Sequence, residues 1–140
     1  MKHYNTKCLE KRFFDNDQYP LQDETNAILG IGIKIHKSLG AGFLEIVYKD
    51  AFEYEFSKQS ISYFREKEYK IIYDSIILPH RFYADFVVFD KIILEIKSKE
   101  GGIAEIDYAQ TLNYLKASGC KVGLILNFGK LKLDIKRVVF

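Results

Sequence analysis

Apolar residues recur every three or four positions in three stretches of the chain, which is the spacing of amphipathic helices. Gly40 and Gly42 follow the first stretch, so we expect a tight glycine joint between the first two helices. Gly119 is placed to end the third helix, and Asp23 or Thr25 is available as the N-cap of the first. The pattern predicts helices over residues 23–39, 44–58 and 103–118.

Between and after these helices the chain turns to short runs of Ile, Val, Phe and Tyr bounded by turn residues, which predict strands. Pro79 should weaken regular pairing in its immediate neighbourhood, because proline cannot donate to a strand ladder. The predicted strands are residues 62–73, 76–88 and 91–98, then VGLILNF and, after Gly129, LKLDIKRVVF. The order ααβββαββ predicts an α/β sandwich with a mixed central sheet flanked by helices.

The first 22 residues mix charged, aromatic and polar groups without a clear period, and we interpret them as an N-terminal arm before one globular domain over residues 23–140. No apolar run approaches the length of a membrane span, and the N-terminus has no signal-peptide core, so we expect no membrane association. Cys8 and Cys120 match neither a disulfide framework nor a zinc spacing, which favours a reducing, cytoplasmic setting.

Composition constrains the partners only weakly. The 21 Lys and Arg against 19 Asp and Glu give a net charge of +2, which permits a polyanionic partner without requiring one. The aromatic content of 15% could supply the surface of a homodimer.

The segment YADFVVFDKIILEIKS carries Asp85, Glu95 and Lys97 inside a predicted hairpin that is otherwise strongly apolar. Alternate residues of a strand share a face, so Glu95 and Lys97 point the same way. Asp85 joins them if the loop is the three residues 89–91, which would place Asp85 opposite Glu95, whereas a two-residue turn would place it opposite Ile96. The site hypothesis therefore predicts a three-residue or bulged loop.

Two carboxylates facing each other across a strand pair repel unless a cation lies between them. Oxygen ligands of this kind suit Mg²⁺ or Mn²⁺, and Lys97 could orient or deprotonate a water molecule. The alternative is a solvated face of an outer hairpin, with Glu95 and Lys97 guarding against edge pairing. Both faces of the hairpin are apolar, with Val87 and Ile93 on the same side as the charges, which favours the site.

The pattern of Asp followed ten residues later by Glu-x-Lys resembles the PD-(D/E)xK nuclease superfamily, with Ala84 standing where the motif has Pro. The segment GFLEIVY, with Gly42, Glu45 and Tyr48, resembles the bacterial GxxExxY family of that superfamily. The blocks ADFVVFDKIILEIKS, AQTLNYLKASG, VGLILNFG and IKRVVF follow in the family's order, and the resemblance covers residues 23–140. It implies a restriction-endonuclease-like fold.

The resemblance also implies roles for individual residues. Asp85 and Glu95 would be the metal-binding carboxylates, the backbone carbonyl of Ile96 a further ligand, and Lys97 the catalytic lysine. Glu45 would be the family's helix-borne acid. Its alternative interpretation is that a carboxylate in the first turn simply interacts with the helix dipole.

Gln110 and Tyr114 lie one turn apart on the predicted third helix and resemble the Gln-x-x-x-Tyr pair that flanks the active site of related nucleases. The alternative is a polar pair on a solvent-facing stripe. Tyr48 lies three residues after Glu45 and could serve only to position it. We expect His36 to be a packing or capping residue, and Arg137 is either an inward ion-pair partner or a phosphate contact.

These observations favour a Mg²⁺-dependent or Mn²⁺-dependent nuclease acting on DNA or RNA. The alternative is a catalytically silent domain of the same fold that binds nucleic acid or another protein. A small homodimeric scaffold is a third hypothesis.

Overall fold

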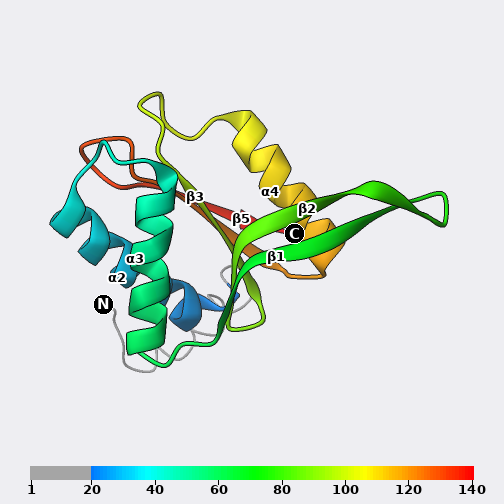
Figure 1. The fold of residues 1–140 in the computed structure, drawn as a ribbon, viewed down its shortest axis with the longest axis horizontal. Coiled ribbons are helices and arrows are strands. Elements are labelled where there is room, and N and C mark those ends of the chain that lie inside the picture. Colours follow the sequence, from blue (N-terminus) through cyan, green and yellow to red (C-terminus); the bar gives the residue numbers. More distant parts are fainter. Residues whose placement is uncertain (1–19) are drawn as a thin grey trace, which may run out of the picture.

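The computed structural model describes residues 20–140, so most of the predicted N-terminal arm lies outside the described part. Within that part, three helices and a five-stranded mixed sheet follow one another in the predicted order ααβββαββ (Figure 1). Most boundaries lie within two residues of the prediction. The helices are α2 (Gln22–Leu39), α3 (Glu45–Lys58) and α4 (Glu105–Ser118), and the strands are β1 (Tyr63–Tyr73), β2 (Ile76–Val88), β3 (Ile92–Lys97), β4 (Val122–Asn127) and β5 (Asp134–Val139).

The sheet has the strand order β1-β2-β3-β4-β5, and its only parallel neighbours among the described strands are β3 and β4, which α4 connects. Helices α2 and α3 cover one face, where Phe52 packs with Phe86 and Leu94. Helix α4 covers the other face, where Leu115 packs with Val87 and Ile93. Both faces of β2 and β3 are therefore buried, as the continuous apolar runs of these strands predict.

The joint between α2 and α3 uses both predicted glycines, Gly40 with a φ of 69° and Gly42 with a φ of 110°. The hydroxyl of Tyr48 closes this joint, since it donates to the Gly40 carbonyl at 2.6 Å and accepts from the Phe43 N–H at 3.3 Å. The Tyr48 ring is fully buried and stacks on Phe128 with centroids 4.4 Å apart. These contacts fix the position at which α3 begins.

The predicted N-cap of α2 is wrong. Helix α2 begins one residue before Asp23, with Leu21 in the N-cap position and no side-chain cap, so Asp23 and Thr25 both lie inside its first turns. Arg137 explains how this end is held instead, because its guanidinium donates to the Thr25 hydroxyl at 3.0 Å and to the carbonyl of Pro20. Arg137 thereby ties β5 to the start of α2.

Strands β1 and β2 form a long hairpin whose far half extends beyond the rest of the sheet (Figure 1). Their register shifts between Lys70 and Ile72, and Pro79 lies in the unpaired stretch of β2 opposite this shift, which confirms the predicted weak pairing. Asp74 and Ser75 form the tip with positive φ values of 51° and 65°. Large apolar side chains around this tip are exposed: Ile72, Tyr73, Ile76 and Ile77.

The segment after β3 passes very close to the segment after β4. The Asn127 side chain holds the crossing, accepting from the Lys99 N–H at 2.8 Å and donating to the Lys99 carbonyl at 2.9 Å. At Gly129 an added Cβ would lie 2.4 to 2.5 Å from backbone atoms of Lys99. Glycine is therefore required at position 129 for steric reasons. Only without a side chain there can the backbone after Lys97 pass this close to the segment after β4.

We expect Gly129→Ala to lower the free energy of unfolding by about 1–3 kcal/mol, because backbone atoms cannot yield as a flexible side chain does. Urea unfolding followed by circular dichroism measures this change. Gly30→Ala is the matched control, since nothing lies within 4 Å of an added Cβ at this helical position. There alanine should be neutral or stabilising by up to about 1 kcal/mol. Equal stabilities of the Gly129 variant and the native chain would contradict the steric argument.

Candidate functional site

The register of β2 against β3 tests the geometry proposed for the two carboxylates. Phe86 pairs with Leu94, and Val88 pairs with Ile92, so the loop is the three residues 89–91 and the predicted loop length is confirmed. Phe89 and Asp90 both have a φ of 58°, and the Lys91 N–H donates to the Val88 carbonyl at 3.1 Å. Continuing this register places Asp85 opposite Glu95.

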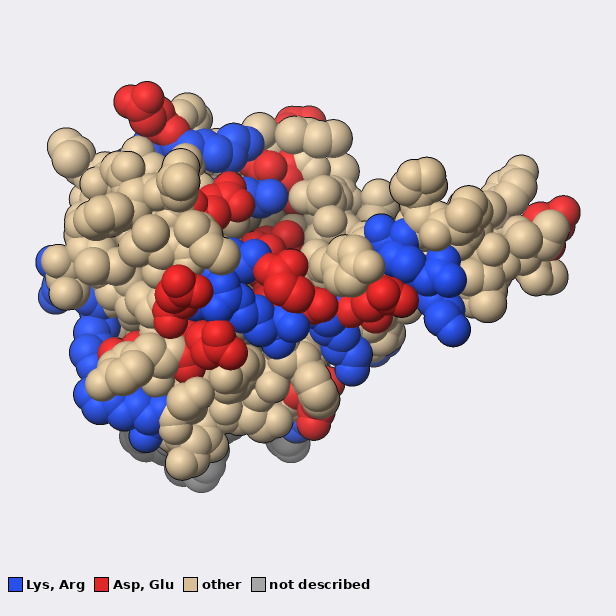
Figure 2. All heavy atoms as spheres, in the orientation of Figure 1, with Lys and Arg blue, Asp and Glu red and all other residues tan. Residues whose placement is uncertain are grey.

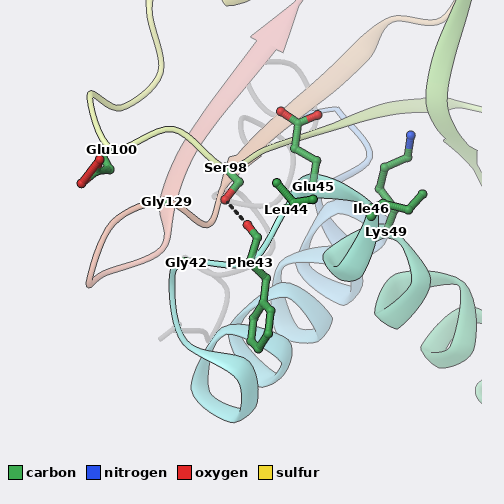
Figure 3. A pocket seen from close by; sticks show the side chains of 9 residues that line it. All are labelled: Gly42, Phe43, Leu44, Glu45, Ile46, Lys49, Ser98, Glu100 and Gly129. Atoms are coloured by element: carbon green, nitrogen blue, oxygen red, sulfur yellow. Dashed lines mark hydrogen bonds between the residues drawn. The ribbon is translucent and has the colours of Figure 1, made fainter.

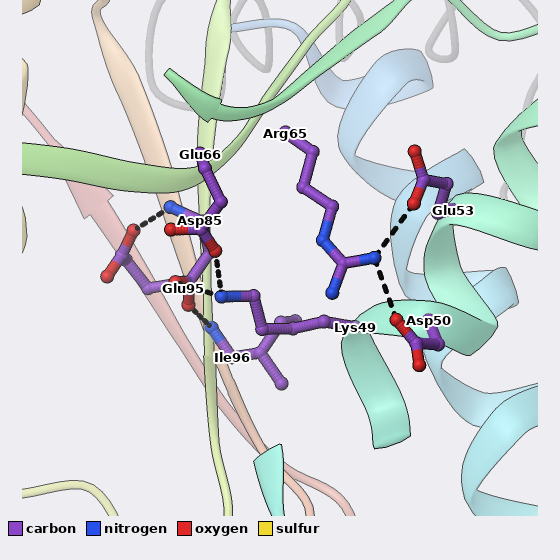
Figure 4. Close-up of polar contacts among 8 residues, drawn as sticks. All are labelled: Lys49, Asp50, Glu53, Arg65, Glu66, Asp85, Glu95 and Ile96. Carbon is purple, nitrogen blue, oxygen red and sulfur yellow. Dashed lines mark hydrogen bonds and ion pairs between the residues drawn. The ribbon is translucent and has the colours of Figure 1, made fainter. Parts of the chain in front are cut away.

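At Asp85 and Glu95 the regular ladder gives way to hydrogen bonds between side chains and backbone (Figure 4). The Asp85 N–H donates to Glu95 Oε2 at 2.9 Å, and the Ile96 N–H donates to Asp85 Oδ2 at 2.8 Å. Each carboxylate thus accepts a hydrogen bond from a backbone N–H of the neighbouring strand. The positions of the two carboxylates are therefore fixed by backbone N–H groups.

Burial makes this pair of like charges costly. Glu95 is 3% exposed, and desolvation, followed by the charge of Asp85, raises its pKa to about 8. The N–H of Asp85 and the ammonium groups of Lys97 and Lys49 act in the opposite direction. Without an additional cation, the pair is therefore most stable when Glu95 keeps its proton at neutral pH.

The donor set fits a hard divalent cation. In residues 20–140 no group of three or more His, Cys, Asp or Glu side chains is arranged to hold a metal ion. The side-chain oxygens that this position offers are those of Asp85 and Glu95. Mg²⁺ is commonly bound by one or two carboxylates and keeps several water molecules. A cation would also remove the electrostatic cost that raises the pKa of Glu95.

Lys97 lies at the end of β3, and its Nζ is 3.9 Å from Asp107 Oδ1 in the first turn of α4. Asp107 also binds the Lys99 ammonium and accepts from the Ala104 N–H at 2.9 Å. Burial raises the pKa of Asp107, but these cationic and N–H donors outweigh it and hold the pKa below its usual value. An ionised Asp107 therefore attracts the Lys97 ammonium toward the start of α4.

Tyr114 brings α4 close to the same carboxylates. Its ring stacks on Phe82 of β2 with centroids 4.3 Å apart. Burial, followed by the negative charges of Glu95 and Asp85, raises the pKa of Tyr114 to about 12, and a hydrogen bond with Gln110 acts in the opposite direction. Gln110 itself is exposed. The structure thus brings Tyr114 near the pair, with Gln110 farther out on the same helix face.

Glu45 is the first residue of α3 and is exposed, without a side-chain cap at this helix end. It lies on the rim of a pocket of about 700 Å³, together with Lys49 from the same face of the helix (Figure 3). The Ser98 hydroxyl, just after β3, donates to the Phe43 carbonyl at 2.7 Å and closes one side of this pocket. Glu45 is thus near the end of β3, while its interaction with the helix dipole stays an equally good explanation of its position.

Three charged residues at the site were missed by the sequence analysis: Asp107, described above, Lys49 and Glu66. Lys49 of α3 is only 11% exposed in its side chain, and its Nζ lies 3.1 Å from Asp85 Oδ1 and also contacts the Glu66 carboxylate (Figure 4). Lys49 lies three residues before Phe52 and seven before Phe56, so helical spacing could have placed it on the buried face. The sequence contains no comparable indication for Glu66. It lies on the exposed side of the alternating pattern of β1, where a charged residue is expected to face solvent.

His36 has the packing role expected of it. Its Nε2 lies 2.9 Å from the Lys130 carbonyl, and its ring lies 5.8 Å from that of Phe128. These contacts join the end of α2 to the loop before β5. His36 is not among the groups around Asp85 and Glu95.

The raised pKa of Glu95 predicts a pH-dependent stability in the metal-free protein. Between the normal pKa of 4.5 and the folded value of about 8, the folded protein retains a proton that the unfolded chain releases. The free energy of unfolding should therefore fall as the pH rises through this window, by at most about 1.4 kcal/mol per pH unit from this group. Urea unfolding in the presence of a chelator, from pH 5 to 9, measures the slope.

Glu95→Gln should remove this contribution, because the amide oxygen can still accept from the Asp85 N–H without carrying a charge. The variant should therefore gain stability relative to the native chain as the pH rises. Glu100→Gln, at an exposed position, is the control and should follow the native curve. Parallel curves for the native chain and Glu95→Gln would contradict the assignment.

Comparisons with known proteins bear on the fold and the family of the chain. A solved structure titled "Crystal structure of SSO0001" resembles this chain with a TM-score of 0.54 and 16% sequence identity, over 99% of this chain and 69% of that one, which shows a shared fold. No curated protein matches the sequence. No helix in the described residues is long and apolar enough to span a bilayer. The family model of the PD-(D/E)XK nuclease superfamily matches residues 22–138, and the chain belongs to this superfamily.

Proposed function

We propose that this chain is a metal-dependent nuclease in which Asp85 and Glu95 hold Mg²⁺ or Mn²⁺. The observation that carries the proposal is the opposition of the two carboxylates, set by the three-residue loop and held by the bonds between Asp85, Glu95 and Ile96. The superfamily match supports the same chemistry. A bound divalent ion would supply Lewis acidity and an activated water for phosphodiester hydrolysis.

Lys97 is the proposed proton-handling residue. It shares the strand face of Glu95, and its ammonium is oriented by Asp107. As an ammonium, a lysine in this position can orient a water molecule or offset negative charge that develops on the phosphate, and as the neutral amine, after releasing its own proton, it can take a proton from the water. The Ile96 carbonyl is proposed as a further metal ligand.

We also propose that the chain belongs to the GxxExxY branch of the superfamily. The three motif residues have distinct physical roles in the joint before α3. Gly42 adopts a φ of 110°, and Tyr48 bonds to the Gly40 carbonyl, so both set the direction in which α3 begins. Glu45 is then presented at the pocket rim, where it assists metal or water binding. Tyr48 is a positioning residue in this proposal.

The proposed substrate is DNA or RNA. Figure 2 shows acidic and basic side chains intermixed on the face drawn, in keeping with the net charge of +2. Such a face offers fewer cationic contacts to a phosphate backbone than a strongly basic one. The metal site would therefore supply much of the attraction for the phosphate. Gln110 and Tyr114 of α4 are proposed to flank the bound strand.

A catalytically silent domain that binds nucleic acid or a protein is the second candidate. The observation that favours it is the ion pair between Lys49 and Asp85, since a lysine ammonium already neutralises one of the two carboxylates. In this case the charged cluster would stabilise the fold without binding a metal ion.

Cleavage of labelled single-stranded and double-stranded DNA and RNA, with Mg²⁺, Mn²⁺ or chelator, tests the nuclease. We expect metal-dependent cleavage that Lys97→Ala lowers by at least about 100-fold, because positioned proton transfer contributes this much. Asp85→Asn should abolish it. Lys116→Ala, which removes an exposed lysine of α4, is the control and should retain full activity.

Circular dichroism must show that each variant is folded. Activity that survives Lys97→Ala would exclude the proposed role of this lysine. Tight binding of a polynucleotide by the native chain, with no cleavage under any metal condition, would favour the silent domain.

A further inference from the structure

Lys49 occupies an unusual position for a lysine. It projects from α3 into a largely buried space, where its ammonium lies 3.1 Å from Asp85 Oδ1 and also contacts the Glu66 carboxylate (Figure 4). Burial alone would lower its pKa, but the two carboxylates more than compensate and hold the pKa of Lys49 above its usual value. The side chain therefore carries a positive charge beside the proposed metal ligands.

Glu66 reaches Lys49 through a local departure from the strand. Arg65 pairs with Phe86 and Lys67 with Ala84, but the intervening pair of Glu66 with Asp85 is missing from the ladder. Glu66 instead has a φ of 55°, a conformation that is strained for a residue other than glycine. Strain of this kind persists only where surrounding contacts impose it.

Helix α3 imposes such contacts on β1. The Arg65 guanidinium, next to Glu66, donates to Asp50 and Glu53 of α3 at 2.8 Å each. These bonds clamp β1 against the helix that carries Lys49. Strand β1 thus brings Glu66 to Lys49 of α3, and Asp85 of β2 is the third member of the cluster.

Both oxygens of Asp85 already have donors. Oδ2 accepts from the Ile96 N–H, which is part of the strand arrangement, while Oδ1 accepts from Lys49, which is a side chain that can move. A divalent ion that binds Asp85 through Oδ1 meets the Lys49 charge at close range, where two cations repel strongly. Glu66 is 49% exposed in its side chain and offers Lys49 a second carboxylate outside the pair.

We propose that Lys49 is the resident counter-cation of the carboxylate pair, and that it competes with a divalent ion for Asp85, so that it gives up Asp85 and keeps only Glu66 as its partner when the ion binds. The inference rests on the proposed metal-binding function and adds Lys49 and Glu66 to that site as positioning residues. Its consequence is that the metal-free site is partly neutralised, so that the ion binds more weakly than two buried carboxylates alone would allow.

Mn²⁺ titration followed by electron paramagnetic resonance tests the competition, with the native chain, Lys49→Met and Lys34→Met compared. Methionine preserves most of the apolar length of lysine and removes the charge. We expect Lys49→Met to bind Mn²⁺ at least 10-fold more tightly than the native chain. Lys34→Met removes the same charge from an ion pair with Glu55, away from Asp85, and should change the affinity less than three-fold.

The outcomes separate this inference from the proposed function. Mn²⁺ binding by the native chain with unchanged or weaker binding by folded Lys49→Met would overturn the inference alone. Absence of binding by both proteins would overturn the inference and the proposed metal site together. Binding by Lys49→Met alone would support the inference and show how strongly the native lysine opposes the ion.

A measurement on the native chain covers the case in which Lys49→Met does not fold. Acetylation by acetic anhydride, followed by peptide mass spectrometry, reports how accessible each lysine ammonium is. Saturating Mn²⁺ should raise the labelling rate of Lys49 at least three-fold, because the ammonium loses Asp85, and leave that of Lys34 unchanged. An unchanged Lys49 rate at a Mn²⁺ concentration shown to saturate the site would overturn the inference.

Discussion

Two carboxyl groups lie side by side where β2 and β3 separate, and the cost of placing two negative charges there, away from water, determines which groups must surround them. Glu95 is buried, and Asp85 lies against it, so neither can rely on water to disperse its charge. Backbone N–H groups bind both side chains. Lys49 then lies on one side of the pair and Lys97 on the other.

Both layers of the sandwich contribute to this neighbourhood. Helix α3, on one face of the sheet, supplies Lys49, and helix α4, on the other face, supplies Asp107 and Tyr114. A regular strand pair would separate the two faces by its own backbone. Because the ladder is interrupted at Asp85 and Glu95, groups from both faces can act on the same two carboxylates.

The order of elements and the register of the hairpin could be predicted because they depend on short-range patterns. Alternation in β2 and β3 and the loop after Val88 suffice to place Asp85 opposite Glu95. The way in which the start of α2 is held could not be predicted in this way, because Arg137, more than a hundred residues later, replaces a side-chain cap. Glu66 was missed for a related reason, since its conformation depends on contacts between β1 and α3.

The partner of the Lys97 ammonium also could not be predicted from the sequence. Strand parity gives the face on which its side chain emerges, but the partner on that face depends on where α4 begins. Asp107 is ten residues later and follows a glycine-containing turn that the alternation of β3 does not describe. Strand alternation and loop length therefore predicted the positions of Asp85 and Glu95, but not the contacts of the lysines around them.

An insertion or deletion would have different effects at the two ends of β2. At the loop of residues 89–91, loss or gain of one residue would shift β2 against β3 by one position, so that the side chains of one of the two strands would have to turn to the opposite face. At the tip formed by Asp74 and Ser75, matched additions to β1 and β2 would lengthen the projecting hairpin and leave Glu66 and Asp85 in place. Insertions and deletions in related chains should therefore collect at the tip and be absent from the loop.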